Sequence, residues 1–261
     1  MISSALKFTL PLLVLNCYTA NYSAHSPYVQ ASDEQYSKAL KLKSEYNYKD
    51  ALSLFQKLVA TDSNQINYLT NASFCFIKYG FYLAPAPEKQ GYYKTAEYLS
   101  KKAIQKNANS ADAHYTYAMA LGRINENASS KQKITNAKLI KTEVDKSISL
   151  NPKQAGAYHI LGRWHRTIAG FSMIEKAMIN SFFGGVPPGG SYDDAVKAFM
   201  TAIGIEPKVM IHQYELAETY HEMGKDVDAK VWAKKALEIN PVSPDDKKAK
   251  TDCEALLKKL D

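Results

Sequence analysis

A repeat with a period of 34 residues constrains the fold of this chain more than any other feature of its sequence. Four positions near the carboxyl end recur 34 residues later: Ala195, Phe199, Ala202 and Pro207 are matched by Ala229, Ala233, Ala236 and Pro241. Small residues at this spacing let two helices approach closely, and proline ends the second helix of each pair. This period is that of tetratricopeptide helical hairpins. The sequence therefore predicts an all-α, tetratricopeptide-like superhelix.

The same spacing of small and apolar residues extends back to about residue 33, which predicts five hairpins followed by a capping helix over 245–260. Three hairpins carry insertions between their helices, centred on 80–93, 124–134 and 167–191. Connections of this length are usually functional or disordered. In the third insertion, apolar residues recur at steps of three and four up to the glycine- and proline-rich stretch 184–190. We therefore expect the first helix of the fourth hairpin to run to about twice the usual length.

The first 32 residues differ from the repeat domain, which we assign to 33–261. Residues 8–15 form an apolar run that is too short to cross a membrane but fits the core of a secretory signal. Cys17 follows this run as in a lipoprotein processing site, although Asn16 stands where a small residue is expected. We expect a signal peptide or lipoprotein signal over 1–17, a polar linker over 18–32, and an exported, periplasmic or membrane-tethered protein. The alternatives are a plain membrane anchor and an uncleaved cytoplasmic, cytoskeleton-associated protein.

The excess of basic residues indicates a solvated basic surface first, and a preference for acidic partners second, without pointing to nucleic acid. The chain has 33 Lys plus Arg against 26 Asp plus Glu, a formal net charge of +7. These basic residues are spread along the chain, so we expect no nucleic-acid partner. Cys17, Cys75 and Cys253 are too few for a disulfide framework, and Cys75 is expected in the core.

No motif of a known catalytic chemistry is present in the sequence. The nucleophile elbow, the zinc-protease helix motif, the phosphate loop and the dinucleotide fingerprint are all missing. His159 and His165 are six residues apart and so do not share a helix face as a metal-binding pair would. We therefore predict no enzyme activity, no catalytic residue, no cofactor and no metal ion.

In such a superhelix the first helix of each hairpin lines the concave surface. This placement selects nine candidate groove residues: Phe76, Tyr115, Met119, Arg123, His159, Arg163, Arg166, Tyr214 and His221. The arginines can bind a carboxylate or phosphate with two hydrogen bonds. They can equally pair with Glu218, Glu222 or Glu175 of this chain. Arg163 is the best single candidate for a ligand contact, and Trp164 beside it is expected in the core.

The apolar residues of the third insertion leave the class of ligand open. Phe171, Ile174, Met178, Phe182 and Phe183 could fold over the groove as a lid, pack on the adjacent hairpin, or touch a membrane. A lid over an apolar groove favours a lipid, whereas an open groove favours a peptide. The leading hypothesis is a scaffold for a protein partner or an acidic peptide segment. The alternative is a lipid-binding or membrane-tethering protein with a phospholipid or membrane as its partner.

Several segments resemble the regulator of microtubule dynamics family from about residue 33 to the end. They are 158–164 (YHILGRW), 171–176 (FSMIEK), 71–76 (NASFCF), 111–114 (ADAH), and Gly224-Lys225 followed by Ala229 and Trp232. The resemblance implies a non-catalytic helical-repeat adaptor with roles at microtubules and at membrane contact sites. Two departures are the signal-like start and Met173, where the family commonly has Trp.

Overall fold

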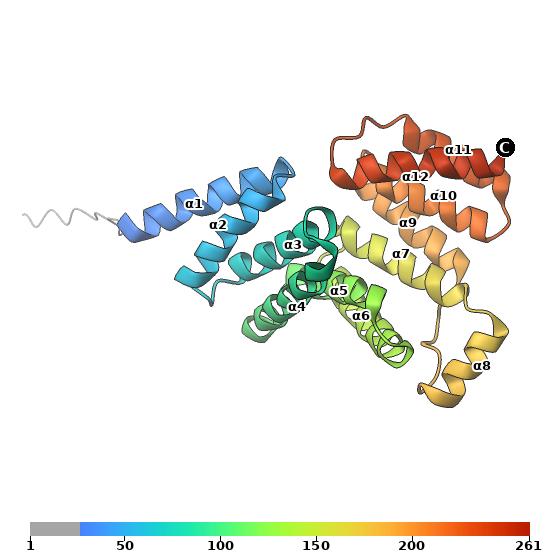
Figure 1. The fold of residues 1–261 in the computed structure, drawn as a ribbon, viewed down its shortest axis with the longest axis horizontal. Helices are drawn as coiled ribbons and strands as arrows, with labels where there is room; N and C mark the ends of the chain where they lie inside the picture. The colour runs from blue at the N-terminus through green and yellow to red at the C-terminus, as the bar shows by residue number, and fades with distance from the viewer. Residues whose placement is uncertain (1–26) are drawn as a thin grey trace, which may run out of the picture.

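A computed structural model describes residues 27–261, and within this range no residue lies in a β-strand. The helices form five consecutive hairpins (Figure 1). These hairpins pair α1 (Pro27–Ser44) with α2 (Tyr48–Thr61), α3 (Ile66–Tyr82) with α4 (Lys89–Lys106), α5 (Ala111–Ile124) with α6 (Ser130–Leu150), α7 (Ala155–Ala169) with α9 (Tyr192–Ile205), and α10 (Met210–Glu222) with α11 (Asp226–Leu237). The last helix, α12 (Pro244–Leu260), packs on both α10 and α11. The predicted tetratricopeptide-like superhelix with a capping helix is confirmed.

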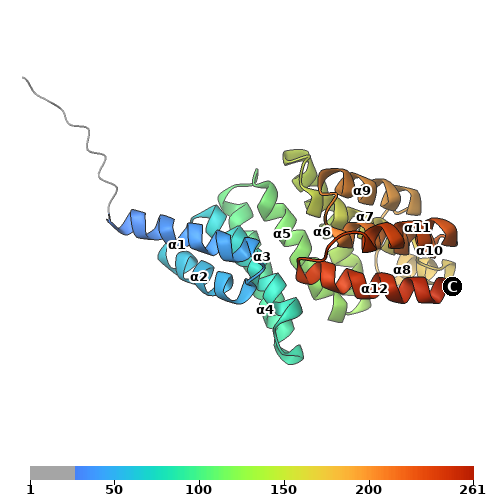
Figure 2. The ribbon, with the colours of Figure 1, turned by 90° about the horizontal axis from the view of Figure 1, so that it is seen from above.

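The hairpins follow one another along the molecule from α1 at one end to α9–α12 at the other (Figure 2). The first helix begins at Pro27, inside the stretch that the sequence assigned to a linker. The predicted signal segment and Cys17 lie outside the described residues. No described helix is both long enough and apolar enough to cross a membrane.

The repeated positions found in the sequence form the contacts between helices. All six matched Ala and Phe residues of α9 and α11 are fully buried. Gly162 in α7 faces Phe199, and a Cβ at Gly162 would lie 2.7 Å from its ring. Only glycine therefore permits this approach of α7 to α9. The turn from α10 to α11 uses Gly224 at a φ of 72°.

Short polar side chains begin many of the helices. Ser110 caps α5, Ser191 caps α9 and Ser243 caps α12, each by accepting a hydrogen bond from a backbone N–H in the first turn. Asp246 completes a capping box with Ser243 and also accepts a hydrogen bond of 2.9 Å from the backbone N–H of Met210. The start of α12 is thereby fixed to the start of α10.

The three insertions differ in structure. The first holds the 3-10 turn Ala86–Glu88 and the second the 3-10 turn Asn125–Asn127. The third holds a separate helix, α8 (Met173–Phe182), so the prediction of a double-length α7 is wrong. The helix α7 ends at Ala169, and Ser172 forms a capping box with Glu175 that starts a new helix. The apolar period continued through this break and hid it.

Two core assignments made from the sequence are confirmed. Cys75 is a fully buried free thiol in α3. Trp164 is buried between hairpins, and its indole N–H donates a 2.8 Å hydrogen bond to the carbonyl of Ala137 in α6.

Candidate binding groove

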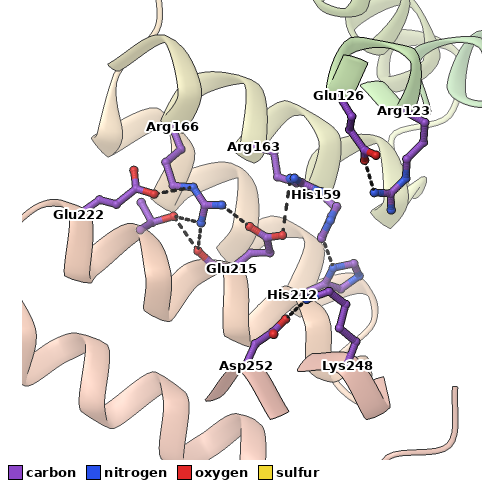
Figure 3. Close-up of polar contacts among 11 residues, drawn as sticks. Arg123, Glu126, His159, Arg163, Arg166, His212, Glu215, Glu222, Lys248 and Asp252 are labelled. Atoms are coloured by element: carbon purple, nitrogen blue, oxygen red, sulfur yellow. Dashed lines mark hydrogen bonds and ion pairs between the residues drawn. The ribbon is translucent and has the colours of Figure 1, made fainter. Parts of the chain in front are cut away.

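A groove of about 1350 Å³ is lined mainly by the first helices of the hairpins and by the start of α12. Seven of the nine candidate groove residues line it: Tyr115, Met119, Arg123, His159, Arg163, Arg166 and Tyr214. Figure 3 shows how the polar side chains of α7 and α10 meet in its middle.

Phe76 and His221 lie outside the groove, contrary to the sequence assignment. Phe76 is buried and its ring lies 6.0 Å from that of Tyr92 in α4, because the face of α3 that meets the groove carries Phe74 and Lys78 instead. His221 lies at the end of α10, where its Nδ1 is 2.7 Å from an Asp226 oxygen. Both residues therefore serve contacts between the two helices of a hairpin.

Arg166 is committed to contacts within the protein. Its Nη2 lies 2.5 Å from Oε2 of Glu215, its Nη1 donates to the Glu215 carbonyl at 3.0 Å, and its Nε lies 3.4 Å from Glu222 (Figure 3). Although burial alone would raise the pKa of Glu215, the guanidinium groups of Arg163 and Arg166 lower it to about 2. The Glu215 side chain is therefore a buried anion that fixes α7 to α10.

Glu222 was among the partners expected for these arginines from the sequence, but Glu215 was not. The missed signal was the spacing of Glu215, Thr219 and Glu222, which lie at steps of four and three and so share one face of α10.

Arg163 retains hydrogen-bonding capacity toward the groove. Its Nε lies 3.5 Å from Oε1 of Glu215, and its side chain is 50% exposed. Among the described residues, its other guanidinium nitrogens have no hydrogen-bond partner. Arg163 can therefore offer two N–H groups to an anionic ligand while it remains oriented by Glu215.

His159 lies one turn before Arg163 and contacts a second histidine. The Nδ1 atoms of His159 and His212 lie 3.0 Å apart, so one ring donates its N–H to the other. Burial, and then the nearby His212, lower the pKa of His159 to about 3. The His159 ring is therefore neutral at pH 7 and adds no charge to the groove.

Arg123 is held by two neighbours. Its guanidinium carbon lies 3.7 Å from the centroid of the Phe81 ring, and its Nη1 lies 2.8 Å from Glu126. These contacts hold the Arg123 guanidinium over the Phe81 ring and leave it paired with Glu126.

A cationic residue that the sequence analysis missed lies in α1. Lys43 donates a 2.6 Å hydrogen bond to the neutral side chain of Asn71, and its Nζ lies 5.0 Å from the centroid of the Phe74 ring. Within residues 27–261, no carboxylate is within ion-pair distance of Lys43. Burial of its side chain lowers the pKa of Lys43. Lys43 lies near the end of α1, after the small and apolar positions that define the repeat. Its sequence position therefore did not indicate that it lines the groove.

Three residues join the two ends of the groove. Lys78 Nζ of α3 lies 2.5 Å from Oδ2 of Asp245, and the Tyr82 hydroxyl donates a hydrogen bond to its Oδ1. Burial alone would raise the pKa of Asp245, but Lys78 and Tyr82 lower it. We call Lys78, Tyr82 and Asp245 the α3–α12 clasp, because they tie the second hairpin to the capping helix across 167 residues of sequence.

The apolar insertion residues do not act together at the groove. Phe171 lines the groove, whereas Ile174, Met178, Phe182 and Phe183 do not. In the described part of the chain, no group of three His, Cys, Asp or Glu residues could hold a metal ion.

Three comparisons relate the chain to known proteins. Over 167 residues it is 32% identical to regulator of microtubule dynamics protein 1 of Bos taurus, covering 64% of this chain and 52% of the bovine protein. It is 30% identical to regulator of microtubule dynamics protein 3 of the same species over 172 residues, which are 66% of this chain and 36% of that protein. The matched region thus spans about half or less of these relatives.

A solved structure confirms the fold class. The crystal structure of a thermophilic tetratricopeptide-repeat protein of Thermus thermophilus superposes with a TM-score of 0.63, covering 87% of this chain and 98% of that protein, at 16% identity. The model of the family described as regulator of microtubule dynamics protein 1-3 matches residues 28–261. The chain is a helical-repeat protein and belongs to the regulator of microtubule dynamics protein 1-3 family.

Proposed function

We propose that this chain is a non-catalytic scaffold that holds an extended acidic segment of a partner protein in its groove. The observation that carries the proposal is the presence of two groove cations, Lys43 and Arg163, whose hydrogen-bonding capacity is not used up within the described residues. A carboxylate on a partner would gain a charge-assisted hydrogen bond from either of them.

The remaining lining suits the apolar side chains of such a segment. Tyr115, Met119, Ile160 and Ile211 line the groove between its polar contacts. Apolar walls with a few oriented charged groups are typical of ligand sites in proteins. With His159 neutral and Arg166 fully paired, Lys43 and Arg163 remain as cationic contacts, together with the exposed Lys133 and Lys208, which also line the groove.

Fluorescence anisotropy with a labelled decapeptide of alternating Glu and Leu tests this proposal. The double variant Lys43→Gln, Arg163→Gln should weaken binding by about tenfold or more, since charge-assisted hydrogen bonds are each worth about 1.5–3 kcal/mol. Arg166 is left intact because the fold depends on it.

The matched control removes two charges elsewhere. Lys101→Gln with Lys197→Gln alters exposed ion pairs outside the groove and should leave the affinity unchanged within about twofold. Equal weakening by the two double variants would mean that net charge, and not the groove, attracts the peptide.

A microtubule role is suggested by the names of the relatives alone. We propose that the groove or the basic surface contacts tubulin, and co-sedimentation with polymerised tubulin tests this. Pelleting that decreases with added salt would support the proposal, and the absence of pelleting at low salt would exclude it.

A second candidate ligand is a phospholipid. The groove volume of about 1350 Å³ exceeds the roughly 300–1,000 Å³ typical of drug-sized ligands, and Lys43 and Arg163 could meet a phosphate at its polar end. Native mass spectrometry after mild purification should then show a co-purified lipid. An empty protein in repeated preparations would contradict this candidate.

Export remains a proposal that rests on residues 8–17 of the sequence. Mass spectrometry of the mature amino terminus distinguishes an acylated Cys17, a chain cleaved nearby, and an intact chain. The last result would favour the cytoplasmic alternative.

A further inference from the structure

The carboxylate of Asp245 reaches the groove from a helix whose packing lies elsewhere. The buried apolar residues of α12 pack with those of α10 and α11, and none of them belongs to the core around α3. Among the described residues, every hydrogen bond and ion pair between α3 and α12 ends on this one carboxylate. Figure 1 and Figure 2 show the start of α12 directed toward α3. A single side chain therefore joins the two helices across the groove.

The cap of α12 does not use Asp245. Ser243 and Asp246 form the capping box, and Asp246 also accepts the hydrogen bond from the Met210 N–H. Asp245 lies beside them in the first turn, with its side chain 22% exposed. Its side chain can therefore leave α3 while α12 keeps its cap and its place on α10.

The side chains that hold Asp245 form a site on one face of α3. Phe74, Lys78 and Tyr82 follow one another at steps of four, so they lie on the same side of the helix, and all three line the groove. The Nζ of Lys78 lies 5.5 Å from the centroid of the Phe74 ring and 6.0 Å from that of the Tyr82 ring. These rings orient its ammonium group. Lys78 and Tyr82 thus offer one donor to each oxygen of a carboxylate.

This part of the groove has two lysines and one carboxylate bound between them. The Nζ of Lys43 lies 5.0 Å from the centroid of the same Phe74 ring and donates its hydrogen bond to the neutral Asn71. Within residues 27–261, Asp245 is the only carboxylate at ion-pair distance from either lysine, and it pairs with Lys78. A segment with two acidic residues can therefore pair with both lysines once Asp245 has left.

The charge of Asp245 acts on neighbouring walls of the groove. Burial, and then the charge of Asp245, raise the pKa of Tyr48 in α2 and that of Tyr115 in α5. Both tyrosines line the groove. The negative charge that Lys78 and Tyr82 bind therefore lies inside the groove, where the charge of a bound acidic side chain would lie.

We propose that Lys78 and Tyr82 form a carboxylate-binding site of the groove, and that Asp245 occupies it in place of an acidic side chain of the partner. This inference rests on the proposed function, because it adds a contact to the same acidic segment. When the segment binds, one of its carboxylates accepts the hydrogen bonds from Lys78 and Tyr82, and Asp245 turns to solvent. The ligand itself thereby releases the α3–α12 clasp.

Competition with Asp245 sets a requirement on the partner. Asp245 belongs to the same chain, so its effective concentration at the site far exceeds that of a free carboxylate. A single acidic residue cannot displace it, whereas a segment that also binds Lys43 and Arg163 gains the additional contacts that displacement requires. The site therefore selects partner segments with several acidic residues.

Fluorescence anisotropy of the labelled Glu–Leu decapeptide with the full-length protein tests this exchange. Asp245→Ala should bind the peptide roughly tenfold more tightly than the parent protein, because Lys78 and Tyr82 have lost their internal partner. Adding Lys78→Gln to Asp245→Ala should remove most of this gain. Asp245→Asn, which removes the charge and keeps the shape of the side chain, should change the affinity in the same direction as Asp245→Ala. Circular dichroism checks that each variant is folded.

Glu218→Gln is the matched control for the loss of one negative charge. Glu218 also lines the groove, and the neighbouring Arg166 pairs with Glu215 and Glu222 instead. Its replacement therefore removes a carboxylate without freeing a cation. The affinity for the peptide should change by less than about threefold.

The outcomes separate this inference from the proposed function. Equal gains in Asp245→Ala and Glu218→Gln would overturn the inference, because net charge and not the freed site would attract the peptide. An unchanged or weaker affinity of Asp245→Ala, with binding that still depends on Lys43 and Arg163, would overturn the inference and leave the proposed function standing. The absence of binding to both the parent protein and Asp245→Ala would overturn both.

Discussion

At the scale of single residues, the carboxylate of Glu215 orders the middle of the groove. It lies in α10 and is contacted by Arg163 and Arg166 of α7. The two arginines around this carboxylate are unequal, because the Arg166 side chain is 13% exposed and that of Arg163 is 50% exposed. One arginine therefore holds the fold and the other is free to serve a ligand.

Replacing Arg166 should be far more damaging than replacing Arg163. Arg166→Ala leaves Glu215 as a buried anion with one distant partner, which should lower the free energy of unfolding by about 3–5 kcal/mol. Arg163→Gln should lower it by less than about 1 kcal/mol. Urea unfolding measures both, and similar values for the two variants would contradict this division of roles.

The neutral His159 should make stability depend on pH. Because its pKa is about 3 in the folded protein, against about 6.5 for an unfolded histidine, the unfolded state takes up a proton that the folded state does not. The contribution of the neutral His159 to the free energy of unfolding is fully present above about pH 6.5. It decreases as the pH falls toward 3, by at most about 1.4 kcal/mol per pH unit.

Urea unfolding at pH 7 and pH 5.5 measures this dependence. His159→Gln should show a smaller loss between the two pH values than the parent protein does. Equal losses would assign the dependence to other groups.

At the scale of helices, the packing of α7 on α9 depends on the glycine at position 162. A methyl group there would meet the Phe199 ring at 2.7 Å. Gly162→Ala should therefore destabilise the protein by about 1–3 kcal/mol through overpacking.

The control for this substitution is another helical glycine. Gly204 in α9 is exposed, and a methyl group added there would have no atom within 4 Å, so Gly204→Ala should be neutral or stabilising by up to about 1 kcal/mol. Thermal unfolding compares the two. A loss of stability in both variants would mean that backbone freedom, and not the contact with Phe199, is what glycine supplies.

Much of this helical framework could be predicted from the sequence, because the spacing of small and apolar residues determines where the helices of each hairpin lie. The 34-residue offset located α9 and α11 through residues that are all buried. The break before α8 was missed, since the apolar period ran through it while Ser172 and Glu175 carried the opposing signal.

The polar contacts of the groove could be predicted only in part. The register of the repeat selected Arg163 and Arg166, but their partner Glu215 depends on how far α10 is rotated against α7. Lys43 could not be identified, because its exposure to the groove results from the orientation of α1 relative to α3. Asp245 meets Lys78 only after all five hairpins have stacked.

At the scale of the whole molecule, the α3–α12 clasp should control how far the superhelix opens. Asp245→Ala removes the acceptor of both Lys78 and Tyr82, which should cost about 1–3 kcal/mol and increase the radius of gyration in small-angle X-ray scattering.

Asp252→Ala on the same helix is the control for the clasp. It breaks only the exposed pair with Lys248, one turn away, and should change stability by less than about 0.5 kcal/mol with no change in size. If Asp245→Ala also left the radius of gyration unchanged, stacking alone would set the shape.

The clasp also bears on the order of events while the chain is being synthesised. Hairpins that contact their nearest neighbours can fold one after another as they leave the ribosome. The contact between Lys78 and Asp245 cannot form until α12 has emerged, because Asp245 follows Lys78 by 167 residues. During translation the groove is therefore open on one side, and a partner present at that time meets a wider entrance than one that arrives after the protein is complete.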